Sequence, residues 1–192
     1  MTVLLWAVLG YLAGSVSLHA PASAVGWALA RRLAPETART WSWPVVYALY
    51  AGAVVAAARG MAGPYEAAGA AVGAVAGHCW PLRGAPRPRA GVAPATGAGI
   101  VLLPFETLAA AASVVAMRAV RLHAPANTVA LVVVPILASL RGQPAPYRFA
   151  AWAALLLVIV RRLDGVGAEL EATGSPVGVI TRRVLLGADP PR

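Results

Sequence analysis

The sequence predicts an all-α fold, a polytopic integral membrane helix bundle with about five to seven transmembrane helices. Hydrophobic residues make up 59% of the 192 residues and charged residues only 12%, whereas a soluble domain carries roughly 25% charged residues. The apolar residues form long runs, and arginines stand between the runs; there is no lysine, and the formal charge is +9. A disordered tail, a disulfide scaffold and an ordinary water-soluble enzyme are therefore excluded. Despite the positive charge we expect no nucleic-acid partner.

Each expected span follows from the need for about 20 apolar residues to cross the roughly 30 Å hydrocarbon core. The first run ends before Arg31 and Arg32, and the second before Arg59. The last run is interrupted by the polar segment 141–148 into pieces of about 12 residues, which either span with help from their flanks or form a re-entrant pair. The expected spans are 1–30, 44–58, 63–82, 95–117 and the broken stretch 129–160.

The chain is expected to be a single membrane domain, 1–192, that ends in a cytoplasmic tail, 161–192. Within the tail, residues 177–186 either form a short amphipathic piece on the inner leaflet or fray. Small residues up to Ala24 are typical of a signal-peptide cleavage site. No Lys or Arg precedes the first apolar run, and more apolar runs follow, so cleavage is disfavoured.

The arginines also predict an orientation, because they are enriched in short cytoplasmic loops. Putting the three main clusters in the cytoplasm places the N-terminus outside the inner (plasma) membrane and the C-terminus inside. Arg118 and Arg121 then fall outside with Arg59, which fits less well. The three clusters are Arg31, Arg32 and Arg39, then Arg83, Arg87 and Arg89, and in the tail Arg161, Arg162, Arg182 and Arg183.

The segment 77–99 is the candidate site. Its prolines and glycines prevent a continuous helix, and glycine lets backbone amides approach a ligand closely. Arginines beside the exposed amides of a helix start make a favourable anion site. The segment is therefore either a phosphate-binding loop at the membrane surface or a loop whose arginines only set the topology.

His78 has two interpretations as well. A histidine at the membrane interface can act as a general base near neutral pH, or it can bond a backbone carbonyl and hold the loop. Glu66 and Glu106 lie within apolar spans, where a charge is costly, and we expect interfacial positions with an arginine partner. The three histidines lack metal-ligand spacing, so neither a metal site nor a cofactor is expected.

The order of several motifs resembles the acyl-phosphate-dependent glycerol-3-phosphate acyltransferases of bacteria, the PlsY family. Gly77-His78-Cys79-Trp80-Pro81 is similar to the G-H-x-F-P of that family, and Gly91-Val92-Ala93 to the end of its G-G-K-G-V-A-T. Gly10-Tyr11-Leu12-Ala13-Gly14-Ser15-Val16 resembles its opening G-Y-L-L-G-S-I. Leu157-Val158-Ile159-Val160-Arg161-Arg162 resembles its L-x-I-x-R-H, and Glu171-Ala172-Thr173-Gly174 lies where the family has L-x-G-T-E.

The resemblance implies acyl transfer from acyl phosphate to the sn-1 hydroxyl of glycerol 3-phosphate, giving lysophosphatidate in phospholipid synthesis. The partners would be these two substrates and membrane lipids. His78 would be the catalytic residue, either assisting removal of the hydroxyl proton or orienting the loop. The substrate phosphates would be bound by Arg83, Arg87, Arg89, Gly91, Arg161 and Arg162.

Several family positions are replaced in this chain. The family's S-G-N-x-G-A-T-N motif does not align with Arg31–Thr40, Ala90 stands at the lysine of G-G-K-G, and Arg162 and Gly165 stand at a histidine and an asparagine. A catalytically silent homologue that binds lipid or a membrane partner is therefore the alternative. The small residues of 67–74 suit the close helix packing that such a partner needs. A transporter is a third class, but the sequence shows no internal repeat.

Overall fold

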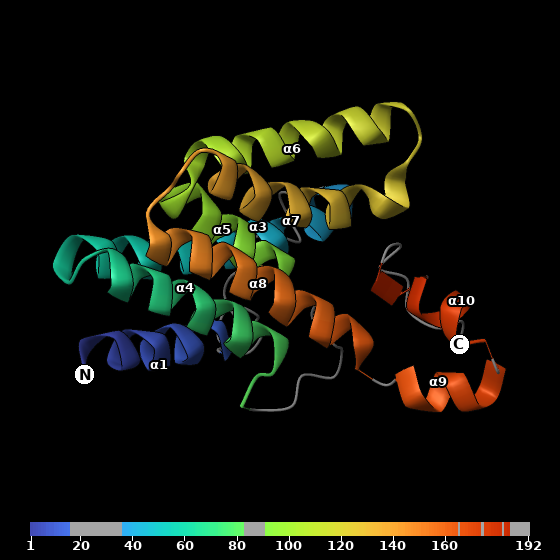
Figure 1. Cartoon of the computed structure of the whole chain (residues 1–192), viewed down its shortest axis with the longest axis horizontal. Helices are drawn as coiled ribbons and strands as arrows, with labels where there is room; N and C mark the ends of the chain where they lie inside the picture. Colours follow the sequence, from blue (N-terminus) through green and yellow to red (C-terminus); the bar gives the residue numbers. More distant parts are fainter. Residues whose placement is uncertain (16–35, 83–90, 165, 174, 182, 185–192) are drawn as a thin grey trace.

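The computed structural model describes residues 1–15, 36–82, 91–164, 166–173, 175–181 and 183–184, and the regular elements within them are helices (Figure 1). The prediction of an all-α helix bundle is therefore confirmed. The helices are α1 (Thr2–Ser15), α3 (Glu36–Met61), α4 (Pro64–Cys79), α5 (Val92–Leu102), α6 (Pro104–Ala119), α7 (His123–Leu140), α8 (Ala145–Leu163), α9 (Val166–Thr173) and α10 (Pro176–Thr181).

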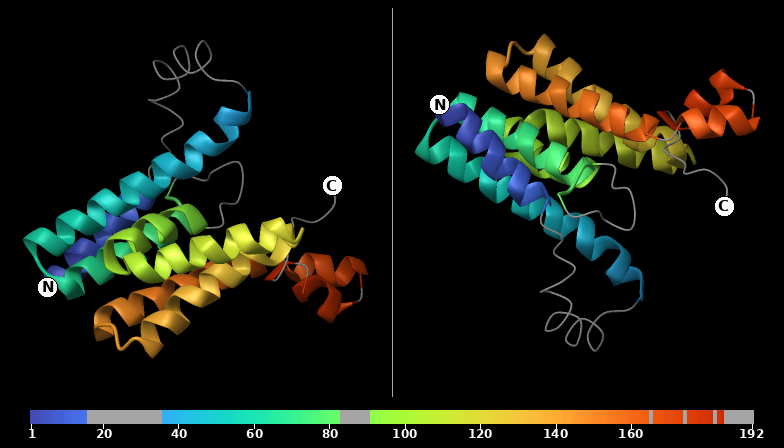
Figure 2. Two further views of the ribbon diagram at one scale, coloured as in Figure 1. Left: turned by 90° about the horizontal axis from the view of Figure 1, so that it is seen from above. Right: turned by 90° about the horizontal axis from the view of Figure 1, so that it is seen from below.

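The bundle has two distinct ends. Helices α1, α4, α6 and α8 run in one direction, and α3, α5 and α7 run in the other (Figure 1). The end where α4 finishes and α5 begins is called the Trp80 end below, and the end with the α3–α4 and α7–α8 turns is called the Gly63 end. Helices α9 and α10 lie beyond the end of α8, at the Trp80 end (Figures 1 and 2).

The apolar stretch expected to be one span at 95–117 is instead two antiparallel helices. Helix α5 ends at Leu102, Leu103 leaves the helical conformation with φ −139° and ψ 59°, and Pro104 begins α6. Proline lacks the N–H that a continuing helix needs but fits the first turn of a new one. As a consequence α6 runs back and carries Arg118 and Arg121 to the Trp80 end.

The break expected at 141–148 is shorter than the sequence suggested. Helix α7 has 18 residues and α8 has 19, so neither is a piece of about 12 residues. Gly142, with φ 65°, makes the turn, and Pro144 caps the start of α8. Pro146 lies in the first turn of α8, where its missing N–H costs nothing. The two helices therefore form an antiparallel pair.

Helices α1 and α4 are parallel and in very close contact, as the view from below shows (Figure 2). A Cβ at Gly10 or Gly14 would lie 2.2 or 2.1 Å from a carbonyl oxygen of α4, and a Cβ at Gly73 or Gly77 would lie 2.1 or 2.0 Å from one of α1. Glycines spaced by four residues let two helix backbones approach in this way. The small residues around 67–74, expected to suit packing against a membrane partner, are thus used within the chain, where α4 packs on α1.

Glu106 is fully buried and ties α6 to the α7–α8 turn at the Gly63 end. Its Oε1 lies 3.3 Å from Nη1 of Arg141 and accepts a 2.8 Å hydrogen bond from Nε2 of Gln143. The expected arginine partner is therefore confirmed for Glu106. Glu66 differs, because its Oε1 accepts a 2.7 Å bond from the hydroxyl of Thr2.

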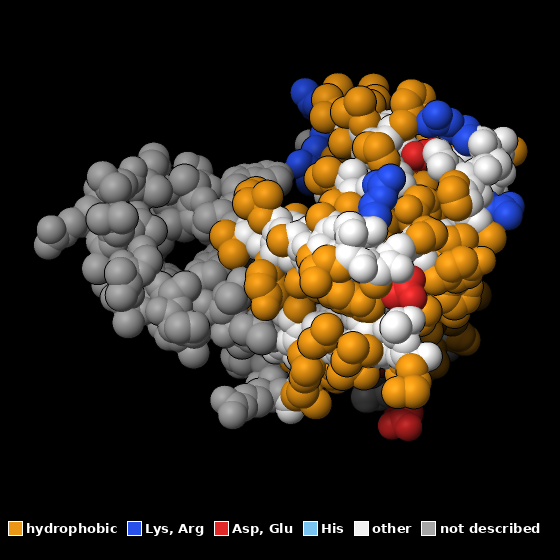
Figure 3. Space-filling view, turned by 90° about the vertical axis from the view of Figure 1, so that its left-hand side faces the viewer, with side chains coloured by type: hydrophobic (Ala, Val, Ile, Leu, Met, Phe, Trp, Pro, Cys, Tyr) orange, Lys and Arg blue, Asp and Glu red, His pale blue; other side chains and the backbone are white. Residues whose placement is uncertain are grey.

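The outer surface of the bundle is rich in large apolar side chains. Leu4, Leu49, Leu108, Phe149 and Leu156 are each more than half exposed, and Figure 3, which views the Gly63 end, shows apolar side chains with arginines and acidic groups among them. Large exposed apolar side chains in such number are typical of contact with lipid. Judged by length and composition, Pro44–Met61 of α3 is able to cross a membrane by itself, with mean hydropathy 1.3 over 18 residues, while Thr2–Ser15, Val92–Leu102 and Pro125–Leu140 are apolar but shorter.

Candidate functional site

Gly91 begins α5 at the Trp80 end and adopts a left-handed conformation, with φ 69° and ψ 0°. It sits directly on the end of α4, since a Cβ at this position would lie 2.6 Å from the sulfur of Cys79. Val75 of α4 and Val158 of α8 also pack against this position, each with a methyl group 3.4 Å from the Cβ position. The glycine therefore holds the N-terminus of α5, and with it the partial positive charge of the helix dipole, against α4 and α8.

Arg161 lies in the last turn of α8, the helix whose Val158 contacts the Gly91 position. Its Nη1 donates to Oδ2 of Asp164, which also accepts a 3.1 Å hydrogen bond from Nε1 of Trp80. The guanidinium carbon lies 5.9 Å from the centre of the Trp80 ring. Tyr11 fixes Trp80 from the other side, because its hydroxyl donates to the Trp80 carbonyl at 2.7 Å. The result is a cation held over an aromatic ring at the ends of α4 and α8.

Arg162 points to a different set of partners. Its Nη1 donates to the hydroxyl of Thr128 at 2.5 Å and to the carbonyl of Val184 at 2.7 Å. Thr128 donates to the same carbonyl at 3.1 Å. Arg162 therefore ties the segment after α10 to the start of α7. Its Nη1 is used in these contacts and does not face an open anion site.

His78 lies in the last turn of α4 with only 6% of its surface exposed. Its ring meets the edge of Tyr47 on α3, with ring centres 4.6 Å apart and planes at 67°. His78 thus faces α3, whereas Arg161 contacts Trp80 and Asp164. The structure brings His78, Gly91, Arg161 and Arg162 to the same end of the bundle. Arg83, Arg87 and Arg89 lie outside the described residues.

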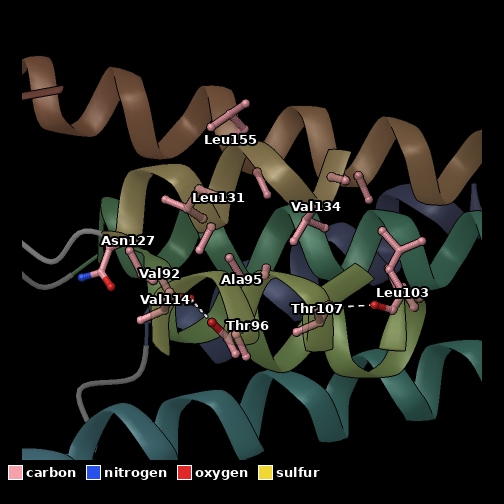
Figure 4. A pocket seen from close by; sticks show the side chains of 18 of the residues that line it. Val92, Ala95, Thr96, Leu103, Thr107, Val114, Asn127, Leu131, Val134 and Leu155 are labelled. Atoms are coloured by element: carbon pink, nitrogen blue, oxygen red, sulfur yellow. Dashed lines mark hydrogen bonds between the residues drawn. The ribbon is translucent and has the colours of Figure 1, made fainter. Parts of the chain in front are cut away.

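A groove of about 440 Å³ runs between α5, α6, α7 and α8 (Figure 4). Its walls are mostly Ala, Val and Leu side chains. Polar groups are few, and three of them, Thr96, Arg118 and Asn127, lie toward the Trp80 end. The groove therefore offers an apolar space whose polar end opens on the side of the molecule that holds Gly91 and Arg161.

Sequence reasoning missed several of these residues. Asp164 follows Arg161 at the i, i+3 spacing that favours ion pairs on a helix, so the pair was detectable from spacing alone. Tyr47 and Thr128 carried no such signal, because each meets its partner across the bundle. The groove was also out of reach, since it exists only because α5 and α6 are separate helices.

Two comparisons of the sequence with known proteins find nothing: no protein-family model matches it, and no curated protein does. The fold does match solved structures. One is a crystal structure of PlsY (YgiH), an integral membrane glycerol 3-phosphate acyltransferase, in its lysophosphatidic acid form, with TM-score 0.70, 17% identity and coverage of 94% of this chain and 99% of that chain.

The glycerol 3-phosphate form of PlsY (YgiH) matches as well, with TM-score 0.69, 18% identity and coverage of 90% of this chain and 94% of that one. The match extends over nearly the whole of both chains. This chain therefore has the PlsY fold, with a sequence that diverges widely from the solved PlsY structures.

Proposed function

We propose that the protein transfers an acyl group from acyl phosphate to the sn-1 hydroxyl of glycerol 3-phosphate and releases lysophosphatidate. The observation that carries the proposal is the placement of a basic helix-start site and the polar end of an apolar groove at one end of a PlsY-like bundle. The phosphate groups of both substrates suit the basic helix-start site, and the acyl chain suits the apolar groove.

The chemistry asks little of the protein beyond positioning and charge stabilisation, because the acyl group arrives activated. The glycerol hydroxyl oxygen forms a bond to the acyl carbonyl carbon, the bond from that carbon to the phosphate oxygen breaks, and inorganic phosphate leaves. Arg161 and the first amides of α5 at Gly91 support the phosphate charge. His78 either accepts the hydroxyl proton or holds the loop that binds the substrate. Arg83, Arg87 and Arg89 supply further positive charge from 83–90.

We place the Trp80 end in the cytoplasm and the N-terminus outside. The support is the distribution of arginine: Arg118, Arg121, Arg161, Arg162 and Arg183 lie at the Trp80 end, and the segments with the other two arginine clusters join helices there. The α5–α6 break supports this placement, because it puts Arg118 and Arg121 at the same end of the bundle as the main clusters.

The test is a turnover assay on detergent-purified protein with myristoyl phosphate and labelled glycerol 3-phosphate. We expect lysophosphatidate from the wild type and its loss in His78→Ala. Arg161→Ala is expected to lower kcat/KM for glycerol 3-phosphate or acyl phosphate by roughly tenfold or more, the usual effect of removing a charge-assisted bond. Arg87→Ala and Arg89→Ala should also weaken use of the phosphate substrates.

The matched control is Arg148→Ala. Arg148 is an exposed arginine on the same helix as Arg161 but lies in the first turn of α8, at the Gly63 end. Its loss removes the same charge far from the candidate site and should leave kcat/KM unchanged. Equal effects of the Arg148 and Arg161 substitutions would contradict a local role for Arg161.

The alternative is a catalytically silent homologue that binds lipid or a membrane partner. It is favoured by the contacts of Arg162, which stands where the PlsY family has a histidine and here holds Thr128 and Val184. Folded protein that binds neither substrate and forms no product would establish this alternative over acyl transfer.

A further inference from the structure

The exposure of the groove between α5 and α8 changes from one end to the other. Toward the Trp80 end its lining includes exposed residues, Thr96 and Asn127, and the half-buried Arg118. Toward the Gly63 end the lining is buried: Leu102, Leu103, Thr107 and Tyr147 are 6%, 2%, 8% and 7% exposed. The groove thus has a polar mouth and a closed, mainly apolar floor.

The floor is fixed by contacts of its own. The Thr107 hydroxyl donates to the Leu103 carbonyl at 2.8 Å, so its proton is used at the floor itself (Figure 4). Arg59 covers Tyr147, with its guanidinium carbon 5.7 Å from the ring centre, and donates to the Val101 carbonyl at 2.7 Å. These contacts involve α3, α5, α6 and α8, so the floor cannot recede easily when a longer ligand enters.

The length of the groove follows from its walls. The lining extends along α5 from Val92 to Leu103 and along α6 from Thr107 to Arg118, and each stretch corresponds to about 16 Å at 1.5 Å per residue. An extended hydrocarbon chain with C–C bonds of about 1.5 Å advances about 1.25 Å per carbon. The space therefore accepts about 13 extended carbons.

We propose that this groove sets the length of the acyl chain: the phosphate lies at the mouth, where Val92 follows Gly91, and the chain end meets the floor of Leu103, Thr107 and Tyr147. This specificity rests on the proposed acyl transfer. The residues that set the permitted length lie on α8, where Ala151 and Ala154 line the groove one turn apart. Ala154 is nearer the mouth and Ala151 nearer the floor, because α8 runs from the Gly63 end to the Trp80 end.

The experiment replaces each alanine by leucine and measures kcat/KM across acyl phosphates from octanoyl to stearoyl. Both substitutions should move the optimum to shorter chains, and Ala154→Leu should move it further, by about four carbons for one helical turn. The ratio of myristoyl to decanoyl phosphate kcat/KM should fall by roughly tenfold or more in Ala154→Leu. Ala116→Leu is the control, because Ala116 is exposed on α6 and does not line the groove.

A binding measurement separates this proposal from the proposed function. Alkyl phosphates from octyl to octadecyl cannot react, and their affinities are measured by calorimetry on the same detergent-solubilised variants. If the preferred alkyl length becomes shorter in Ala154→Leu while the wild type shows no turnover, the result supports selection by chain length and rejects acyl transfer. Equal losses of affinity at all chain lengths would overturn selection by chain length, whether or not the enzyme is active. A larger shift of the preferred length in Ala151→Leu than in Ala154→Leu would overturn the proposed direction of the chain in the groove.

Discussion

Position 91 sets two requirements that only glycine meets together. Its left-handed φ of 69° costs any L-residue with a side chain roughly 1–2 kcal/mol. In addition, the sulfur of buried Cys79 leaves no room for a Cβ. The position therefore couples the start of α5, a candidate phosphate contact, to the packing of α4 and α8.

Gly91→Ala is expected to lower the free energy of unfolding by about 2 kcal/mol or more, from the backbone strain and the overlap with Cys79. Unfolding in mixed micelles with increasing dodecyl sulfate measures the change. Gly60→Ala is the control, because Gly60 lies in α3 and a Cβ there meets nothing within 4 Å. That variant should be unchanged or more stable by up to about 1 kcal/mol. Similar losses in both would argue against a special role for Gly91.

The sequence alone identified some residues of the candidate site but not the contacts that these residues make. Gly91 was identifiable because a glycine between a proline-rich segment and an apolar helix is typical of a turn or a close backbone approach. His78 was identifiable as a candidate, but its contact with Tyr47 was not, since the two residues lie 31 positions apart on different helices. Arg162 was assigned to phosphate from the family resemblance and its charge, and neither reveals that Thr128 and Val184 hold the side chain.

The elements show why apolar runs predict helices better than they predict helix ends. Within the run 95–117, Pro104 is as compatible with a kink as with a break. What decides for a break is tertiary: α5 packs on α3, and α6 packs on α7. Gly97 permits the first contact, because a Cβ there would lie 1.8 Å from the Ala48 carbonyl oxygen.

Alanine substitutions of the α4 glycines test the close contact between α1 and α4. The Cβ of Gly73→Ala would lie 2.1 Å from the Ala7 carbonyl oxygen. This substitution should therefore separate the two helices and lower the free energy of unfolding by about 1–3 kcal/mol. Gly69→Ala should cost less, since the corresponding distance to the Val3 carbonyl oxygen is 3.0 Å. The same micelle titration compares them, and an equal or larger cost at Gly69 would contradict the packing described here.

For the whole molecule, the number of chain reversals decides which arginines share a side. With one more reversal at Leu103, the ends of α6 and α8 come to the same side as the end of α4 (Figure 1). The sequence alone indicated the main clusters but left Arg118 and Arg121 on the wrong side, because the reversal was hidden inside an apolar run.

Cysteine labelling tests the proposed orientation. Ala62→Cys lies in the exposed α3–α4 turn at the Gly63 end, and Leu122→Cys lies in the exposed α6–α7 turn at the Trp80 end. A membrane-impermeant maleimide should label the first in intact cells and the second only after the membrane is opened. The native Cys79 is buried, so the unsubstituted chain should give little signal. The reverse labelling pattern would invert the orientation.

The pairing of α1 with α4 also has a consequence for biosynthesis. Gly10 leaves the ribosome first, yet Ala70, the α4 residue that it contacts, is made 60 residues later. At 5–20 residues per second the interval is roughly 3–12 s. During that time α1 lacks the helix that its glycine face contacts in the folded chain. A chain arrested before Pro64 therefore leaves α1 without the helix that completes its packing, and such nascent chains are the ones that the quality-control proteases of a membrane should recognise.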